Sequence, residues 1–175
     1  MRLAELLLGP LKDSDRAVKL LTEARRRFPG AAEIVYYLAI AQREAKQNQQ
    51  AVATFEEALH EAQIEEDDEF VNAKFYFNYG AAAEQAGLYD KASNLLRKSI
   101  TLDPENSAEA CNYLGYMLAD HNMNLEEAEL MIRRAFQSAP GNASYLDSLG
   151  WVDFLMGKFD QALSDLLLSS KTSAR

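Results

Sequence analysis

The sequence predicts an all-α fold, a solenoid of stacked helix–turn–helix units, and two recurring patterns indicate it. An alanine recurs at intervals of 34, 41, 36 and 34 residues, at Ala17, Ala51, Ala92, Ala128 and Ala162. A large apolar residue follows each alanine four positions later, at Leu21, Phe55, Leu96, Ile132 and Leu166. Periods of this length are typical of helical repeats, and residues four apart share one helix face.

A pair of residues ending in glycine or alanine lies on the predicted first helix of the units, at Leu38-Ala39, Tyr79-Gly80, Leu114-Gly115 and Leu149-Gly150. We expect the three glycines to lie where two helices approach closely. Three of the four prolines lie twelve residues after the recurring alanine, at Pro29, Pro104 and Pro140. Proline there ends the second helix of a unit.

Residues 1–31 are expected to form an incomplete unit. Leu3–Leu8 reads as the end of a first helix, stopped by Gly9-Pro10, and Asp13 or Ser14 is expected to cap the second helix. Counted back from the first recurring alanine, the first helix would begin before the first residue. We therefore expect the array to start in the middle of a unit.

Residues 32–65 form the second predicted unit, and its turn, Lys46-Gln47-Asn48, lacks the usual glycine. The acidic insertion 66–72 follows and accounts for the longest interval. A charge run of this kind is typical of a solvated segment. The alternatives are a calcium site or an acidic hook for a basic partner, although the alternating Asp/Asn and glycine of a calcium loop are missing.

Residues 73–106 and 108–142 are predicted to be full units, and 143–175 a last, truncated one. Its second helix carries Leu166-Leu167-Leu168. Because a terminal repeat normally has a polar capping face, we expect the native protein to continue or another chain to cover this end. Residues 1–175 are thus expected to be a single array within a longer protein.

Charge and composition exclude several classes of function. The net charge of −9 argues against nucleic acid as a partner, because nucleic-acid binding needs a basic surface. Cys111 is the only cysteine, so an intrachain disulfide is impossible. No apolar run reaches the roughly 20 residues of a membrane helix, so we expect no membrane insertion by this segment. Met1–Leu8 is interrupted by Glu5 and is interpreted as helix rather than signal peptide.

The register of the last unit, Leu149-Gly150, Gly157, Phe159 and Ala162, resembles the tetratricopeptide repeat, a helix–turn–helix unit of 34 residues. The resemblance implies a right-handed superhelix whose first helices line a concave groove that binds peptides or partner helices.

Two segments, Asn112–Asp120 and Tyr145–Trp151, are similar to bacterial tetratricopeptide proteins, including outer-membrane lipoproteins that act as scaffolds or protease adaptors. Asp153 departs from that pattern, because a tyrosine is commoner there. The resemblance implies a bacterial adaptor in the cytoplasm or periplasm, or at the outer membrane if the full-length chain carries a signal.

Fixed positions of each first helix face the groove in that family. Carried over to this sequence, they are Tyr36, Ile40, Arg43, Lys74, Phe77, Glu84, Glu109, Asn112, Tyr116, Asp120, Asp147, Trp151 and Phe154. The resemblance thus implies an aromatic ladder of Tyr36, Phe77, Tyr116 and Trp151, and exposed aromatics are good binding anchors. Their alternative role is in the core, packed on the neighbouring unit. Acidic residues between them would select a basic segment.

Some members of the family clamp a C-terminal carboxylate with lysine, arginine and asparagine. Lys74 and Asn78 lie near such positions, but the companion basic residues are absent. We therefore do not expect a carboxylate clamp.

Catalytic chemistry needs a constellation of nucleophile, base or metal ligands, and the sequence offers none. His60 and His121 belong to different units, without cysteine or carboxylate at ligand spacing, and Cys111 is expected on a buried helix face. We expect no catalysis, no cofactor and no metal; if the chain is an accessory domain of a larger enzyme, the catalytic part lies elsewhere.

The predicted function is a non-catalytic scaffold or adaptor whose groove binds an extended or helical segment of a partner protein, with a preference for basic segments. The alternatives are a homo-oligomeric assembly protein that associates through its repeat ends, and an accessory domain of an enzyme. Helical RNA-binding repeats of similar length are disfavoured by the Gly-Ala-Pro register and the acidic balance.

Overall fold

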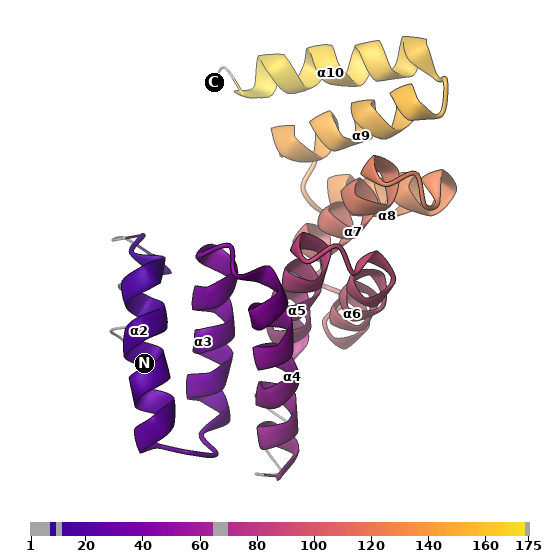
Figure 1. Ribbon diagram of the computed structural model, residues 1–175. Coiled ribbons are helices and arrows are strands. Elements are labelled where there is room, and N and C mark those ends of the chain that lie inside the picture. Colours follow the sequence, from indigo (N-terminus) through magenta and orange to yellow (C-terminus); the bar gives the residue numbers. More distant parts are fainter. Residues whose placement is uncertain (1–7, 10–11, 65–69, 174–175) are drawn as a thin grey trace. The chain divides into compact units, whose positions relative to one another are not determined.

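The computed structural model describes residues 8–9, 12–64 and 70–173, and these ranges contain helices and no strand (Figure 1). The helices are α2 Ser14–Arg27, α3 Ala32–Glu44, α4 Asn48–Ile64, α5 Ala73–Gln85, α6 Tyr89–Leu102, α7 Ala108–Asp120, α8 Leu125–Ser138, α9 Ala143–Leu155 and α10 Phe159–Ser173. The predicted all-α class is confirmed. Most of the predicted first helix end at Leu3–Leu8 and of the acidic insertion 66–72 lies outside the described residues.

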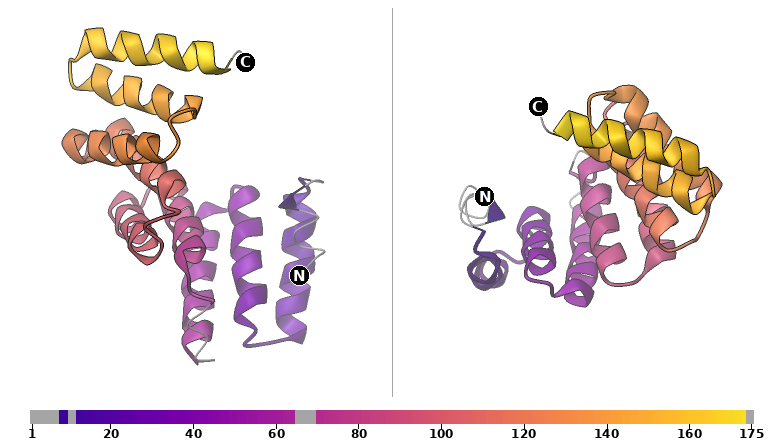
Figure 2. Two further views of the ribbon diagram at one scale, coloured as in Figure 1. Left: turned by 180° about the vertical axis from the view of Figure 1, so that it is seen from behind. Right: turned by 90° about the horizontal axis from the view of Figure 1, so that it is seen from above.

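Contacts divide the chain into two compact units, residues 1–95 and 96–175, and α6 contains the boundary. From here on, we call these two the first unit and the second unit, and we call each helix–turn–helix element a repeat. In the first unit α3 packs against α2, α4 and α5 (Figures 1 and 2). In the second unit α7 pairs with α8, α9 pairs with α10, and α9 also contacts both α7 and α8. Within each unit, the first helix of one pair therefore contacts the first helix of the next.

The turn inside each helix pair is built in the same way. One residue takes a left-handed backbone conformation, with φ of 61° at Lys46, 77° at Gly87, 49° at Asn122 and 76° at Gly157. The N–H of the following residue bonds a carbonyl five residues back, as from Leu88 to Ala83 at 2.9 Å. This arrangement is a Schellman motif, which satisfies carbonyls at a helix end. Lys46 adopts it without the freedom of a glycine.

Close helix contacts occur at two of the predicted glycines. A Cβ atom on Gly115 would lie 2.7 Å from the backbone oxygen of Ala128, and one on Gly150 would lie 2.6 Å from Cγ of Leu166. The five recurring alanines are all buried. Small residues on both sides thus let α7 meet α8, and α9 meet α10, as the register predicted.

The first unit is held together by an aromatic cluster of Tyr36, Phe55, Phe75 and Tyr79. Tyr36 stacks on Phe75 with ring centroids 5.5 Å apart, and Phe55 stacks on Tyr79 at 5.3 Å. Such pairs contribute about 0.5–1.5 kcal/mol beyond the burial of their area. The cluster joins α3, α4 and α5.

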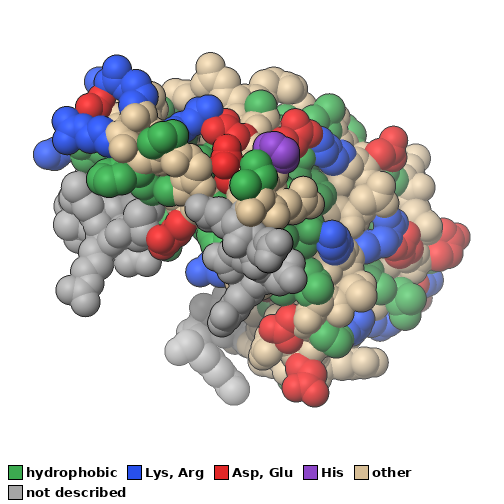
Figure 3. Space-filling model, turned by 90° about the horizontal axis from the view of Figure 1, so that it is seen from below, with side chains coloured by type: hydrophobic (Ala, Val, Ile, Leu, Met, Phe, Trp, Pro, Cys, Tyr) green, Lys and Arg blue, Asp and Glu red, His purple; other side chains and the backbone are tan. Residues whose placement is uncertain are grey.

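The C-terminal end of α2 carries three arginines, Arg25, Arg26 and Arg27, where positive charge complements the helix dipole. Lysine and arginine side chains gather at one edge of the face seen from below in Figure 3. Arg25 also forms an ion pair with Glu57 of α4 at 2.7 Å. Charge in the first unit is therefore mixed, whatever the acidic balance of the whole chain.

Candidate partner-binding faces

Tyr36 of α3 is buried rather than presented to solvent. Its side chain is 8% exposed, and its ring belongs to the aromatic cluster. Its hydroxyl accepts a hydrogen bond from Nδ2 of Asn78 at 2.9 Å. Burial raises the pKa of Tyr36. This residue takes the core role that the sequence left open as an alternative to the ladder.

Asn78 of α5 connects three predicted site residues. Its Oδ1 accepts a hydrogen bond from Nη1 of Arg43 at 3.1 Å, and its Nδ2 donates to the carbonyl of Lys74 at 3.0 Å as well as to Tyr36. Arg43 also pairs with Glu44 at 2.8 Å, and its side chain is only 15% exposed. The side chain of Asn78 thus makes its hydrogen bonds within this unit.

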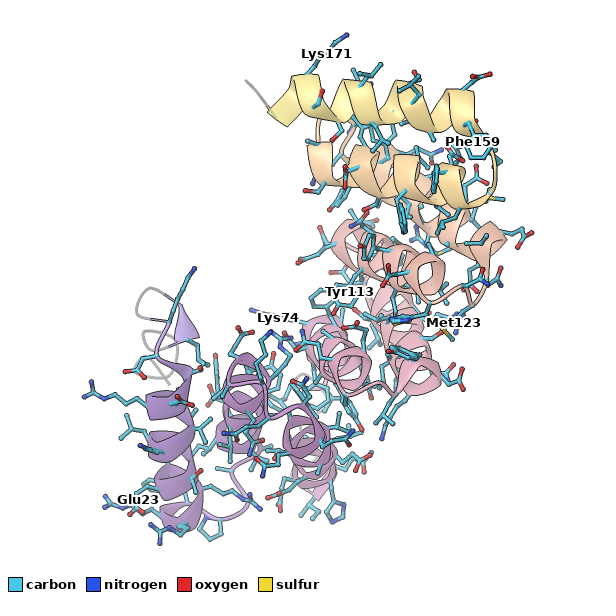
Figure 4. The ribbon with its side chains drawn as sticks, turned by 45° about the horizontal axis from the view of Figure 1, so that its top comes forward. Glu23, Lys74, Tyr113, Met123, Phe159 and Lys171 are labelled. Atoms are coloured by element: carbon cyan, nitrogen blue, oxygen red, sulfur yellow. The ribbon has the colours of Figure 1, made fainter. Side chains whose placement is uncertain are left out.

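The remaining predicted residues of the first unit differ in exposure. Lys74, at the start of α5, is exposed (Figure 4). Ile40, Phe77 and Glu84 are half-buried. Because α3 and α5 carry both signs of charge, this unit offers a mixed rather than an acidic face.

In the second unit, α7 presents a row of predicted residues at spacings of three and four, which places them on one helix face. Glu109, Tyr116 and Asp120 are exposed, and Tyr116 is 45% accessible. Asn112 is half-buried, and its Oδ1 is buried without a hydrogen-bond partner among the described residues. An aromatic ring therefore lies between two carboxylates on this face.

The helix α9 adds an aromatic pair and another carboxylate. Trp151 stacks on Phe154 with centroids 5.9 Å apart and planes 18° from parallel, and both remain solvent-exposed. Phe154 packs edge-on against Phe159, which lies at the start of α10 beside the end of α9 (Figure 4). Asp147 is exposed one helical turn before Trp151. Stacking holds two large rings in place on the surface.

We call Tyr116, Trp151, Phe154, Glu109, Asp120 and Asp147 the acidic aromatic face. Neither α7 nor α9 contains a lysine, arginine or histidine. Burial, and after it the negative charge of Glu109, raises the pKa of Tyr145 on α9. The negative charge on this face is therefore not neutralised from within its own helices.

A partly buried charge cluster joins α8, α9 and the turn that follows α9. Asp153 is fully buried, with Nη2 of Arg133 at 3.4 Å and Nζ of Lys158 at 3.5 Å from its carboxylate oxygens. Glu129 accepts hydrogen bonds from Lys158 at 2.6 Å and from Arg133 at 2.8 Å. Partial burial opposes its ionisation, but these bonds hold the pKa of Glu129 below its ordinary value. The only sign of this cluster in the sequence was Asp153 itself, at a position where tyrosine is commoner in similar proteins.

The environment of Asp165 on α10 should make the stability of the protein depend on pH. Burial, and then the negative charge of Asp153, raises the pKa of Asp165. The folded protein therefore holds this proton more tightly than the unfolded chain, and stability falls as pH rises from the ordinary aspartate range through the raised value. Asp165→Asn should raise the melting temperature at pH 7, and the gain should vanish below the ordinary aspartate pKa.

Thermal melts followed by circular dichroism across this pH range test the prediction. Asp160→Asn is the matched control, because Asp160 is exposed in the first turn of the same helix. The prediction would be contradicted if both variants gained equally in melting temperature at neutral pH, or if the gain of Asp165→Asn grew as the pH fell.

The other candidate chemical residues are dispersed. Cys111 is buried beside Ser107, and His60 is exposed on α4. Over residues 8–9, 12–64 and 70–173, no three His, Cys, Asp or Glu side chains gather as a metal ion would require. None of the helices in these ranges has the length and apolar character of a membrane span.

Comparison with known sequences gives three matches. Two family models, each described as tetratricopeptide repeat, match residues 11–68 and 73–106 and together cover more than half of the chain. A TPR repeat-containing protein of Pseudomonas aeruginosa, PA4667, is 32% identical over 148 residues, which is 85% of this chain. The chain spans only about a quarter of that relative, 24% of its length.

Solved structures share the fold. A structure of MamA from Desulfovibrio magneticus RS-1, from its residue 41 to the end, superposes with a TM-score of 0.82 at 19% identity, covering 99% of this chain and 92% of that one. YrrB, described as a TPR protein with an unusual peptide-binding site, superposes with a TM-score of 0.75 at 21% identity, covering 97% and 82%. These likenesses confirm the predicted class, an α-solenoid of helix–turn–helix repeats. The two family matches, supported by the register of glycine and alanine, show that the chain belongs to the tetratricopeptide repeat family.

Proposed function

We propose that this protein is an interaction scaffold whose acidic aromatic face binds a lysine- or arginine-bearing segment of a partner protein. The observation that supports the proposal is the combination of three exposed rings with three exposed carboxylates on two adjacent helices that contain no basic residue. The proposal rests on the second unit, because the equivalent residues of the first unit are more buried and mixed in charge.

The two kinds of side chain would have different roles. Large rings bury much area and lose little conformational entropy, so Tyr116, Trp151 and Phe154 would hold the ligand. Glu109, Asp120 and Asp147 would accelerate encounter and select the sign of the ligand's charge. A cationic side chain over the Trp151 ring would combine both effects, since cations are attracted to the faces of aromatic rings.

The known relatives are compatible with this role. The description of YrrB as a protein with a peptide-binding site shows that a chain of this fold can hold a peptide. Because YrrB is only 21% identical to this chain, the binding residues are inferred from the side chains of this protein. Those side chains favour a basic ligand.

Selection of short random peptides on the protein tests the proposal, with no partner assumed. We expect enrichment of sequences that combine lysine or arginine with leucine or aromatic residues. Trp151→Ala should weaken the selected peptides about thirtyfold, a loss of about 2 kcal/mol. Because Trp151 is the only tryptophan, its fluorescence reports binding at this face directly in the parent protein.

Leu130→Ala is the matched control, because Leu130 is an exposed apolar residue, 61% accessible, on α8 rather than on the proposed face. Exchanging Asp120 and Asp147 for asparagine should slow association and flatten its salt dependence, with little change in dissociation. Enrichment of acidic peptides, or equal binding by the parent and Trp151→Ala proteins, would refute the proposal.

A further inference from the structure

The pairing of α8 with α9 shows how the second helix of one repeat receives the first helix of the next. Glu129 and Arg133 lie one and five positions after the recurring alanine Ala128. Glu129 binds Lys158 at 2.6 Å, and Arg133 lies 3.4 Å from Asp153. Those two positions therefore mark the face of α8 that meets α9 and the turn after it.

The same register identifies the equivalent face of α10. Gly150 meets Leu166 of α10 as Gly115 meets Ile132 of α8, so the two helix pairs share one packing arrangement. One and five positions after Ala162 stand Leu163 and Leu167, which are 60% and 52% exposed. Two leucines thus occupy the places of Glu129 and Arg133.

Earlier repeats show that charge is usual at the later of these positions. In α4, Glu56 lies five residues after the recurring alanine Ala51, and it pairs with Lys91 of the next helix pair. Arg97, at the same place in the following repeat, binds both carboxylate oxygens of Glu127, at 2.8 and 2.9 Å. The α10 helix differs from α4, α6 and α8, because Leu167 at this position has no charge with which to select a polar partner.

We propose that this face of α10 docks an amphipathic helix that lies on it as α9 lies on α8 and that carries aliphatic side chains where α9 and its turn have Asp153 and Lys158. A partner with those charges would lose their hydration against Leu163 and Leu167 without gaining an ion pair, which is unfavourable. Aliphatic side chains at the same two places would instead remove apolar area from water. This surface is distinct from the acidic aromatic face and carries a different specificity.

Two fluorescein-labelled peptides serve as probes, both spanning residues 142–158 of this chain. One keeps the natural sequence, and the other carries Asp153→Leu and Lys158→Leu. Fluorescence anisotropy should show that the whole protein binds the leucine-substituted peptide at least tenfold more tightly than the natural one. The double variant Leu163→Glu/Leu167→Arg, which copies α8 onto α10, should reverse that preference.

Both substituted positions are solvent-exposed, so circular dichroism of the double variant should match the parent. An unchanged preference in the double variant, or no binding of either peptide to either protein, would overturn the proposal. Light scattering provides the remaining arm. It would show whether the parent protein is a dimer and whether the double variant is a monomer. If so, and if the peptides do not dissociate the dimer, a second copy of this chain covers α10 and the proposal is wrong.

Discussion

Replacing Gly115 with leucine is expected to destabilise the protein by about 3 kcal/mol, the upper end of the usual range for overpacking. A Cβ at this position would meet Cγ1 of Ile132 at 2.6 Å and the backbone oxygen of Ala128 at 2.7 Å. Ile132 is fully buried, and a backbone oxygen cannot rotate away. The helices α7 and α8 would have to separate, and the buried contacts between them would be lost.

The same change at Gly150 should cost only about 1 kcal/mol, the lower end of the same range for overpacking. Its nearest neighbour is the side chain of Leu166, which is 40% exposed and can adopt another rotamer, and the oxygen of Ala162 is farther away, at 3.3 Å. Gly141→Leu is the control, because a Cβ there meets nothing within 4 Å.

Urea denaturation followed by the fluorescence of Trp151 measures these differences in the unit that contains all three glycines. Equal midpoints for the Gly115 and Gly150 variants would mean that the backbone oxygen of Ala128 does not limit the approach of the helices.

The fold could be predicted from the periodicity of the sequence, because the positions that repeat follow local rules of helix packing and turn formation. The glycine and alanine positions follow from the close approach of two helices, and the turns follow from helix ends that need a left-handed residue. The turn at Lys46 was recognised by its place in the register, although its residue type gave no sign of a positive φ of 61°.

The aromatic ladder could be predicted only in part, for a physical reason. Tyr36 and Trp151 stand at equivalent places in their repeats, yet the first is 8% exposed and the second 36%. Phe55 and Phe75 supply rings against which Tyr36 packs, whereas the position of α10 that matches Phe55 is the smaller Leu166. Exposure therefore depends on the size of neighbours from other helices, which a register on one helix does not contain.

The ion pairs were equally hidden from the sequence. Nothing in the sequence indicated that Arg97 would bind Glu127 of the following helix pair. Long charged side chains find partners across helices according to geometry, and their energies at the surface are small, about 0–1 kcal/mol. They refine the interface between repeats without determining the fold.

Replacing Asn78 with leucine is expected to destabilise the protein by about 3 kcal/mol, because the loss affects two partners at once. Asn78 is buried, and its side chain serves both the hydroxyl of Tyr36 and Nη1 of Arg43. Leucine has nearly the same size but neither donor nor acceptor, so the Tyr36 hydroxyl would lose its hydrogen bond in the core, and Nη1 of the half-buried Arg43 would lose its bond to Asn78. Urea denaturation followed by far-ultraviolet circular dichroism measures the loss.

A second substitution separates this effect from simple misfit. Tyr36→Phe removes the hydroxyl that Asn78→Leu leaves unpaired, so the double variant should recover about 1 kcal/mol relative to Asn78→Leu alone. Asn94→Leu, at an exposed position of α6, is the control and should change stability by less than about 0.5 kcal/mol. If the double variant is less stable than Asn78→Leu by the full cost of Tyr36→Phe, the two side chains are energetically independent. The hydrogen bond that joins α5 to α3 would then contribute nothing measurable to the stability of the first unit.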